Sequence, residues 1–381
     1  MTESTNKKIF ISANEPSADL HCAHLIEAIK KIDPSIEFVG IGGDKMHEAG
    51  CFLLENTNDK AAMLLNVVKQ LGYYRSLLKN IETFYKENRI DLTIVCDSPA
   101  FNFHVAKIAK KHNCKTLFYV APQLWAWAPW RIKKLKRTCD KLACILPFEQ
   151  DWFSYRGIDV EFVGNPLFDD VKINFDKDAK DYTDFDPSSA DIVLVPGSRD
   201  AEIEALWPAM QQVCMRISSR WTGCTFHAAA VSESKLEKLK QMQHPNFDCD
   251  YHLDSVLKLS RKADFALVAS GSATLQVAAA GCPMVIMYQS NPFLWKVLGQ
   301  WLVQTRFLSL VNILARKQLV PEFMPYFKSI EPIFQKCSAL LANSKRLTKT
   351  SKELVNLTIP MRQKHTASQN TAEIALKMLN G

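Results

Sequence analysis

Four short loops carry most of the residues that could do chemistry on a polar ligand: residues 14–19, 96–102, 196–199 and 269–276. Each follows a run rich in β-branched or aromatic residues and precedes a stretch with helical periodicity. The carboxyl ends of parallel strands meet at one edge of a sheet, where the ligands of open α/β folds bind. A ligand site is therefore expected to be built from these loops.

The loop at 14–19 is polar and precedes the first expected helix. Its side chains include Glu15, Ser17 and Asp19, and we expect Ser17 or Asp19 to cap that helix. Exposed amides at the start of a helix favour an anion, so the loop is a candidate binding element. A capped turn without a ligand explains the same residues equally well.

The loop at 96–102 places Asp97 directly after a continuous apolar strand, and Pro99 and Asn102 make its turn distinctive. A carboxylate in that position would face a bound hydroxyl and could take its proton as a general base. The alternative is that the carboxylate only caps the next helix. The distinctive turn favours the catalytic interpretation.

The loops at 196–199 and 269–276 suit a phosphate. Gly197 lets a ligand approach the backbone, Ser198 can bond a phosphate, and Arg199 supplies a forked cation for a departing diphosphate. The alternative for Arg199 is a solvated surface side chain. The second loop offers backbone amides for a phosphate from Ser270, Gly271 and Ser272, and Gln276 lies one helical turn later, where it could contact a ribose.

These two loops together indicate a nucleoside-diphosphate site. Neither one is G-x-G-x-x-G or a Walker A loop, which argues against dinucleotide oxidoreductases and P-loop hydrolases. The D-x-D spacings of the chain, Asp184 with Asp186 and Asp248 with Asp250, follow no expected strand. They therefore give no support to a metal at a nucleotide diphosphate.

Two further segments suit lipid. Trp125, Trp127 and Trp130 precede a basic stretch made of Arg131, Lys133, Lys134, Lys136 and Arg137, an arrangement that attracts anionic headgroups. A buried tryptophan cluster beside a solvated helix is the alternative, and nucleic-acid binding is disfavoured by the missing recognition motifs. Residues 61–78 are too apolar for one narrow stripe, which indicates an acyl-chain or membrane contact or else core packing. The candidate contact residues there are Met63, Leu64, Leu65, Val67, Val68 and Leu71.

The elements that must position these loops form two α/β series. Strands are expected at 9–13, 37–41, 92–96, 116–121, 141–146 and 160–164, and again at 191–195, 225–230, 265–269 and 283–288, with helices between them. The polar, Asp- and Lys-rich residues 171–190 are expected to link a first domain, 1–170, to a second, 191–350. A C-terminal helical stretch, 351–381, could complete the first domain.

Composition narrows the class. The 381 residues are 47% hydrophobic and 23% charged, which is typical of a globular protein and excludes disordered, collagen-like and coiled-coil chains. The net charge of +7 is mild. The 11 scattered cysteines form no C-x-x-C pair, so they indicate neither a disulfide framework nor a zinc knuckle, and they suit a reducing cytosol. No uncharged apolar stretch reaches the ~20 residues needed to span a bilayer.

In order and spacing, these motifs resemble one family, the lipid-A-disaccharide synthases, which are glycosyltransferases of the GT-B fold. The family's G-E-x-S-G-D and D-x-P-x-F-N motifs are matched at 14–19 and 97–102. In the rest of the first half, the family's V-W-A-W with a basic helix is matched at 124–127 and 131–136, and L-P-F-E at 146–149. In the second half, P-G-S-R-x-x-E is matched at 196–202, S-G-T-A-T-L-E at 270–276 and C-P-M-V-x-x-Y at 282–288. The later L-P-N-L-L-A-G and P-E segments correspond to 310–315 and 321–322.

The resemblance implies that diacylglucosamine is transferred from a UDP-linked donor to 2,3-diacylglucosamine 1-phosphate, with inversion, to give a β(1→6) disaccharide and UDP. Asp97 would be the base, and Arg199 with the 270–272 loop would hold the diphosphate. Gln276 and Asn312 would complete the nucleotide side. The acceptor side would be lined by Glu15, Ser17, Asp19 and Asn102.

For the whole chain, the resemblance implies two doubly wound, Rossmann-like α/β domains that face a cleft. It implies no required metal or other cofactor and no nucleic-acid partner. The protein would be cytoplasmic, would lie against the inner-membrane surface through the segments that suit lipid, and could be a homodimer.

This chain departs from the family pattern at a few positions. Asn14, Ala18 and Arg316 stand where the family has glycine, Asn165 where it has histidine, and Gln276 where it has glutamate. A side chain at a position of positive φ strains the turn, and alanine tolerates it less well than asparagine. Two alternatives therefore stay open: a degenerate member that binds its sugar ligands without turnover, and a UDP-sugar 2-epimerase-like enzyme, which would need no apolar acyl surface.

Overall fold

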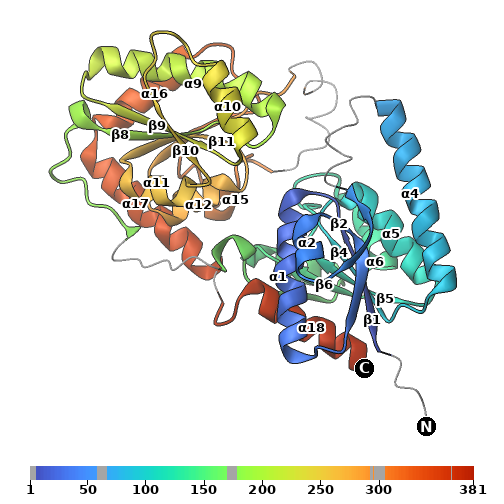
Figure 1. The fold of residues 1–381 in the computed structure, drawn as a ribbon. Helices are drawn as coiled ribbons and strands as arrows, with labels where there is room; N and C mark the ends of the chain where they lie inside the picture. The colour runs from blue at the N-terminus through green and yellow to red at the C-terminus, as the bar shows by residue number, and fades with distance from the viewer. Residues whose placement is uncertain (1–5, 58–66, 170–177, 292–294, 296–304, 362) are drawn as a thin grey trace. The chain divides into compact units, whose positions relative to one another are not determined.

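The computed structural model describes residues 6–57, 67–169, 178–291, 295, 305–361 and 363–381. The chain divides into two compact units, drawn in Figure 1. The first unit is made of residues 1–171 and 361–381, and the second unit is made of residues 172–360.

The first unit is built on a seven-stranded sheet in the order β3-β2-β1-β4-β5-β6-β7. All of its paired strands run parallel, so connecting helices must cross from one end of each strand to the other. The strands are β1 (Lys8–Ala13), β2 (Glu37–Gly42), β3 (Phe52–Asn56), β4 (Leu92–Cys96), β5 (Lys115–Tyr119), β6 (Lys141–Cys144) and β7 (Val160–Phe162).

Helices cover both faces of this sheet, which explains why its central strands are mainly apolar. On one face α1 and α18 contact each other, and Ile9 and Ile94 of the sheet share a core with Leu25 and Ile374 from these helices. On the other face Phe10 packs against Tyr85 of α4. The helices of the unit are α1 (Pro16–Ile32), α2 (Asp44–Glu48), α4 (Val67–Glu87), α5 (Pro99–Lys111), α6 (Ile132–Thr138), α7 (Pro147–Ser154) and α18 (Ala367–Asn380).

The second unit repeats this plan on a six-stranded sheet in the order β10-β9-β8-β11-β12-β13. Its paired strands are again parallel. They are β8 (Asp191–Val195), β9 (Thr225–Ala230), β10 (Asp250–Leu253), β11 (Phe265–Ala269), β12 (Met284–Met287) and β13 (Glu322–Phe323).

One core of the second unit joins Leu194 and Leu267 of the sheet to Trp207 of α9, Leu239 of α10 and Ile333 of α16. The indole nitrogen of Trp207 donates to the Leu239 carbonyl at 3.0 Å, so this large ring is buried without an unmet polar group. The helices of the unit are α9 (Asp200–Arg220), α10 (Glu233–Gln241), α11 (Val256–Lys262), α12 (Ala273–Ala279), α15 (Leu310–Ala315), α16 (Glu331–Leu341) and α17 (Ser344–Thr358).

The expected α/β class with two parallel sheets is confirmed, and the ten expected strands all form. Three strands are absent from the expectation: β3, β10 and β13. β3 and β10 lie at sheet edges and contain exposed or half-buried side chains, and β13 is only two residues long. None of them therefore shows the continuous apolar run that marks a central strand.

The segment expected as a linker lies against the second unit where it is described. Tyr182 is 2% exposed within that unit's core, and its hydroxyl donates to the Asp264 carbonyl. At the other end of the chain, α17 belongs to the second unit, and the chain returns to the first unit at Met361. Among the described residues, no helix is long and apolar enough to cross a membrane.

Candidate functional site

In the first unit, a buried asparagine ties together the loops that follow β1 and β4. These strands are neighbours, with Ala13 paired to Cys96, so their following loops meet. Asn102 is fully buried, and its Oδ1 accepts from the Ser12 hydroxyl at 2.6 Å and from Asn14 Nδ2 at 3.5 Å. Its Nδ2 donates to the carbonyls of Cys96 at 2.9 Å and Asp97 at 2.8 Å. Asn102 therefore holds the turn that presents Asp97.

The turn itself has an uncommon backbone. Asp97 has φ of 51° and Ser98 has φ of 40°, so two successive non-glycine residues adopt the left-handed conformation. Left-handed residues other than glycine cost of order 1 kcal/mol each and persist only where the surroundings enforce them. The Asp97 amide donates to the Tyr119 carbonyl at 3.2 Å, and the Ser98 hydroxyl donates to Glu15 at 3.2 Å. The structure thus brings together three expected site residues: Glu15, Asp97 and Asn102.

The other two residues of the first loop do not cap α1 as expected. The helix begins at Pro16, with Glu15 at the N-cap position, and Ser17 is exposed. Asp19 is 3% exposed, and its carboxylate accepts from the amides of Gly43, Lys45 and Met46 at 2.8, 3.2 and 3.1 Å. The capping expectation was wrong because Asp19 serves α2, whose first amides need a partner.

In the second unit, the loops after β8 and β11 meet in the same way, since Val195 pairs with Val268. Gly197 has φ of 116°, and a Cβ there would lie 2.6 Å from the Glu202 carboxylate, so only glycine fits without a shift. Oε2 of Glu202 accepts from the amides of Ser198 and Arg199 at 3.1 and 3.3 Å, and Oε1 lies 3.0 Å from the Arg199 guanidinium. A carboxylate of the chain itself thus accepts from the backbone amides of the loop that is expected to bind phosphate.

The loop after β11 is more open. Ser270 is half-buried, whereas Gly271 and Ser272 are exposed, and a Cβ built on Gly271 would meet nothing within 4 Å. Gly271 therefore leaves room for a ligand rather than relieving a clash within the chain. Gln276 lies half-buried on α12, so its amide is on the same helix that this loop begins.

Asn312 is placed differently from the expectation of a nucleotide contact. It is fully buried, and its Oδ1 accepts from the amides of Leu319 and Val320 at 2.8 and 3.0 Å. Its Nδ2 donates to the Val320 carbonyl and to Glu322, both at 2.9 Å. All four hydrogen-bonding capacities of the amide are used, so we expect Asn312 to hold the segment after α15 rather than to touch a nucleotide.

The three tryptophans of the first unit separate into one buried and two exposed rings. Trp125 is 7% exposed, and its indole donates to Glu149 Oε1 at 2.9 Å. Oε2 of Glu149 accepts from the amides of Ile145 and Leu146, yet burial outweighs these bonds and raises the pKa of Glu149 to about 7. Trp125 therefore belongs to the core, as the alternative of a buried tryptophan predicts.

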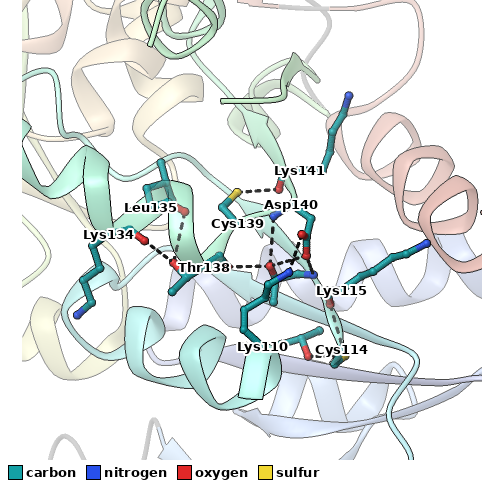
Figure 2. A network of polar contacts seen from close by, with 11 residues as sticks. Lys110, Cys114, Lys115, Lys134, Leu135, Thr138, Cys139, Asp140 and Lys141 are labelled. Carbon is teal, nitrogen blue, oxygen red and sulfur yellow. Dashed lines mark hydrogen bonds and ion pairs between the residues drawn. The ribbon is translucent and has the colours of Figure 1, made fainter. Parts of the chain in front are cut away.

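Trp127 and Trp130 are 44% and 58% exposed, and they precede the basic helix α6. Figure 2 shows how the C-terminal end of that helix is anchored: the Thr138 hydroxyl donates to the Lys134 carbonyl at 3.0 Å, and Asp140 pairs with Lys110 of α5 at 2.7 Å. Burial and the charge of Arg131 lower the pKa of Lys134. The exposed rings and a fixed cluster of cations thus lie next to each other in the chain.

The apolar candidates at 63–71 are only partly covered by the structure. Met63, Leu64 and Leu65 lie outside the described residues. Val67 and Val68 begin α4 and Leu71 continues it, but their side chains are not among those described. The expectation of a lipid contact there stays a prediction.

The departures from the family pattern have different structural settings. Arg316 ends α15 with φ of 53°, so an arginine does occupy a left-handed position there. Asn14 and Ala18 are not among the described residues with positive φ, and Ala18 is buried within α1. The expected strain therefore applies to Arg316 alone. Asn165 is 2% exposed and bonds the Leu167 amide, which is a structural use of its side chain.

Sequence reasoning left three residues of these networks without a role: Ser12, Glu202 and Glu322. Glu202 and Glu322 are the acids of the P-G-S-R-x-x-E and P-E motifs, so their spacing was the available signal. Ser12 is the last polar residue inside an apolar strand, which marks a buried hydroxyl that needs a partner.

Comparison with known proteins agrees with the motifs. Residues 9–378 match the protein family described as lipid-A-disaccharide synthetase. The lipid-A-disaccharide synthase of Geobacter metallireducens is 31% identical over 100% of this chain and 99% of that protein. That of Coxiella burnetii is 30% identical over 98% of this chain and 99% of its own length.

Solved structures agree in fold. The structure of S. aureus MnaA with UDP has a TM-score of 0.62 at 13% identity, covering 99% of this chain and 98% of that one. Acinetobacter baumannii MurG has a TM-score of 0.56 at 14% identity, covering 97% and 99%. Together with the family match, which confirms the resemblance seen in the motifs, these findings identify the chain as a member of the lipid-A-disaccharide synthase family, glycosyltransferases of lipid A biosynthesis with the GT-B fold.

Proposed function

We propose that this protein transfers 2,3-diacylglucosamine from its UDP-linked donor to 2,3-diacylglucosamine 1-phosphate, with inversion at the anomeric carbon. The products are the β(1→6)-linked disaccharide and UDP. The proposal rests on the family and on one structural observation, the turn that presents Asp97. Two successive non-glycine residues there have left-handed backbones, and Asn102, whose amide uses all its hydrogen-bonding capacities, holds them in place. Backbone strain of this kind persists at functional sites.

In the proposed reaction, the 6-hydroxyl oxygen of the acceptor forms a bond to the anomeric carbon of the donor. Asp97 takes the hydroxyl proton as the bond forms. The bond between the anomeric carbon and the diphosphate oxygen breaks, and UDP leaves with the electron pair. Attack from the face opposite the leaving group inverts the configuration at that carbon.

The second unit would hold UDP. Arg199 would bond the diphosphate with charge-assisted hydrogen bonds, and its side chain is 71% exposed and so within reach of a ligand. Ser198 and the open loop from Ser270 to Ser272 would add hydroxyl and amide donors. Gln276 would reach the ribose. Because Glu202 bonds the same amides and pairs with Arg199, we expect UDP to replace these contacts.

The acylated substrates bring the protein to a membrane surface in this proposal. Exposed tryptophans favour the interface between water and lipid, and basic side chains beside an anionic surface contribute about 1 kcal/mol each. Trp127 and Trp130 with the basic helix α6 provide both in the first unit. They, together with the apolar candidates at 63–71, would place the acceptor side against the inner membrane.

The test is release of UDP by the purified protein given acylated or unacylated donor together with the acylated sugar phosphate. The wild-type protein is expected to release UDP and form the disaccharide only with the acylated donor. Asp97→Asn removes the base and should lower kcat about a thousandfold while the protein stays folded. Asp151→Asn changes an exposed carboxylate on α7 and should leave the rate unchanged.

Two outcomes would contradict the proposal. Thermal stabilisation by UDP without turnover by the wild-type protein would identify a degenerate member that only binds. Conversion of an unacylated UDP-sugar into its 2-epimer in the absence of acceptor would favour an epimerase-like reaction instead.

A further inference from the structure

A cluster of two histidines and a carboxylate lies on the sheet of the second unit. His227 is on β9, and Asp250 and His252 are on the edge strand β10. Asp250 pairs with His227 across the two strands, and side chains two residues apart share a face, so all three project from the same side of the sheet. The ligating atoms of the three all lie within 4.8 Å of one another.

Two of the distances between these atoms are close to the edge of a small coordination polyhedron. His227 Nδ1 lies 3.3 Å from His252 Nε2 and 3.6 Å from Asp250 Oδ2. A tetrahedral zinc ion with bonds of about 2.0–2.1 Å separates its ligand atoms by roughly 3.3 Å. A hydrogen bond between the two rings would explain the first distance alone, whereas a shared cation also accounts for the carboxylate.

A second carboxylate, that of Asp191, lies near the cluster. Asp191 Oδ1 lies 3.8 Å from Nε2 of His227, the ring nitrogen on the side away from the other two ligands. Histidines that bind metals commonly direct their second ring nitrogen to a carboxylate, which fixes the tautomer and leaves the other nitrogen's lone pair for the metal. At 3.8 Å Asp191 Oδ1 makes no hydrogen bond to this ring, and it accepts from the Thr225 hydroxyl, so it would have to shift onto Nε2 to aim Nδ1 of His227 at Asp250 and His252.

The position of the cluster separates it from the loops proposed to bind UDP. Asp191 and Asp250 are the first residues of β8 and β10, and His227 is near the start of β9. The loops at 196–199 and 269–276 leave the opposite, carboxyl ends of the same sheet's strands. A cation here would therefore serve the fold of the unit rather than the transfer reaction.

The surroundings allow a cation from solvent to reach the cluster. The side chain of Asp250 is 76% exposed and that of His227 is 24% exposed. Lys258 and Lys262 bring positive charge towards His252, and Asp191 and Asp250 offset it. Two imidazoles and one carboxylate form a donor set that suits zinc, and solvent at the exposed Asp250 could supply a fourth ligand.

We propose that His227, Asp250 and His252 bind a divalent cation of the zinc class, which clamps the edge strand β10 to β9. Asp191 is a positioning residue that orients His227. The site gives a role to Asp250, whose D-x-D spacing with Asp248 fits no nucleotide-metal motif.

The test uses the full-length protein, reduced and stripped of metal by chelator, and titrates it with Zn²⁺ in a calorimeter. One equivalent should bind and raise the melting temperature. The double variant His227→Gln/His252→Gln should lose at least about a hundredfold in affinity, and His47→Gln, an exposed histidine of the first unit, should retain it. Asp191→Asn keeps every ligand and should weaken binding about tenfold.

Because the chain has 11 cysteines, a Co²⁺ spectrum identifies the donor atoms. Nitrogen and oxygen ligands should give visible d–d bands without the strong near-ultraviolet band of a thiolate. The proposal is overturned if the wild-type protein takes up no zinc, if the spectrum shows thiolate ligation, or if the double variant binds zinc as tightly as the wild type does. Should the double variant not fold, undiminished binding by Asp191→Asn is enough to overturn it.

Discussion

The loop after β4 in the first unit and the loop after β8 in the second unit both leave the carboxyl end of a central strand, but they are held differently. Asn102, on the helix that directly follows Asp97, bonds the Asp97 carbonyl and is itself bonded by Ser12 of β1, and the end of β5 accepts from the Asp97 amide. Ser198 and Arg199 are bonded by Glu202, on the helix that directly follows them.

The difference separates two kinds of functional loop. Contacts that reach back to the strands β1 and β5 fix the Asp97 turn in a strained conformation before any substrate arrives, which suits a group that must meet a reacting hydroxyl in one geometry. Contacts within one helical turn are easily exchanged, which suits a loop that replaces its internal contacts with contacts to a diphosphate. We therefore interpret the first unit as preorganised for the chemical step and the second unit as adjustable for binding.

The largest expected effect on stability comes from removing Asn102, the buried asparagine that bonds the Asp97 turn. Asn102→Ala leaves the carbonyls of Cys96 and Asp97 and the Ser12 hydroxyl without their partner, and each unmet buried group costs about 1–3 kcal/mol. We expect a loss of about 4 kcal/mol in the free energy of unfolding and a fall in kcat. Chemical unfolding and the UDP-release rate measure the two effects.

Asn312→Ala is the matched control, because Asn312 is equally buried and equally saturated in the second unit. Hydrogen exchange should show lost protection in β1 and β4 for Asn102→Ala, and in the segment after α15 for Asn312→Ala. If both variants reduced kcat equally at saturating substrate, the special role of the first unit would be refuted.

A slightly smaller effect is expected from pH, through a buried acid of the first unit. Burial raises the pKa of Glu149 from 4.5 to about 7, so the folded state holds this proton more tightly than the unfolded state. Stability from Glu149 is therefore full below pH 4.5 and is lost as pH rises through 7, by about 3 kcal/mol in total.

The measurement compares the free energy of unfolding of the wild-type protein with that of Glu149→Gln from pH 4.5 to pH 8. The variant cannot titrate at this position. As pH rises, the free energy of unfolding of the wild-type protein should therefore fall relative to that of the variant. A difference that stays constant across this range would show that folding does not raise the pKa of Glu149.

The smallest expected effect concerns the second unit, where strain is not needed for catalysis. Arg316 has φ of 53° at the end of α15, a conformation that glycine adopts without penalty. Arg316→Gly should raise the free energy of unfolding by about 1 kcal/mol and leave kcat unchanged. Thermal unfolding checks this, and a loss of stability would mean that the arginine side chain makes compensating contacts.

The sequence predicts the ten strands with continuous apolar or β-branched runs, because burial on both faces leaves that pattern. It also predicts which loops follow these strands, and so places Asp97 and Arg199 beyond the carboxyl ends of strands. It does not predict β10, whose alternation of Asp250 and His252 with apolar neighbours reflects a half-exposed edge. Because β10 was not predicted, the sequence also did not reveal the zinc-class cluster that we propose.

Long-range polar partners are the other part that sequence reasoning missed. Asp19 looked like a cap for its own helix, but it serves amides more than 20 residues further along the chain. Asn312 looked like a ligand contact, but its amide is consumed within the unit. A side chain's type limits which bonds it can make, whereas only the packing of distant segments decides which partner it finds.

The most direct test of the division between the units is a calorimetric titration of UDP into three proteins: the wild type, Asp97→Asn and Arg199→Ala. We predict that Asp97→Asn binds UDP as tightly as the wild type although its turnover is lost, and that Arg199→Ala binds at least about tenfold more weakly. Weakened UDP binding by Asp97→Asn, or undiminished binding by Arg199→Ala, would contradict the assignment of chemistry to the first unit and diphosphate binding to the second.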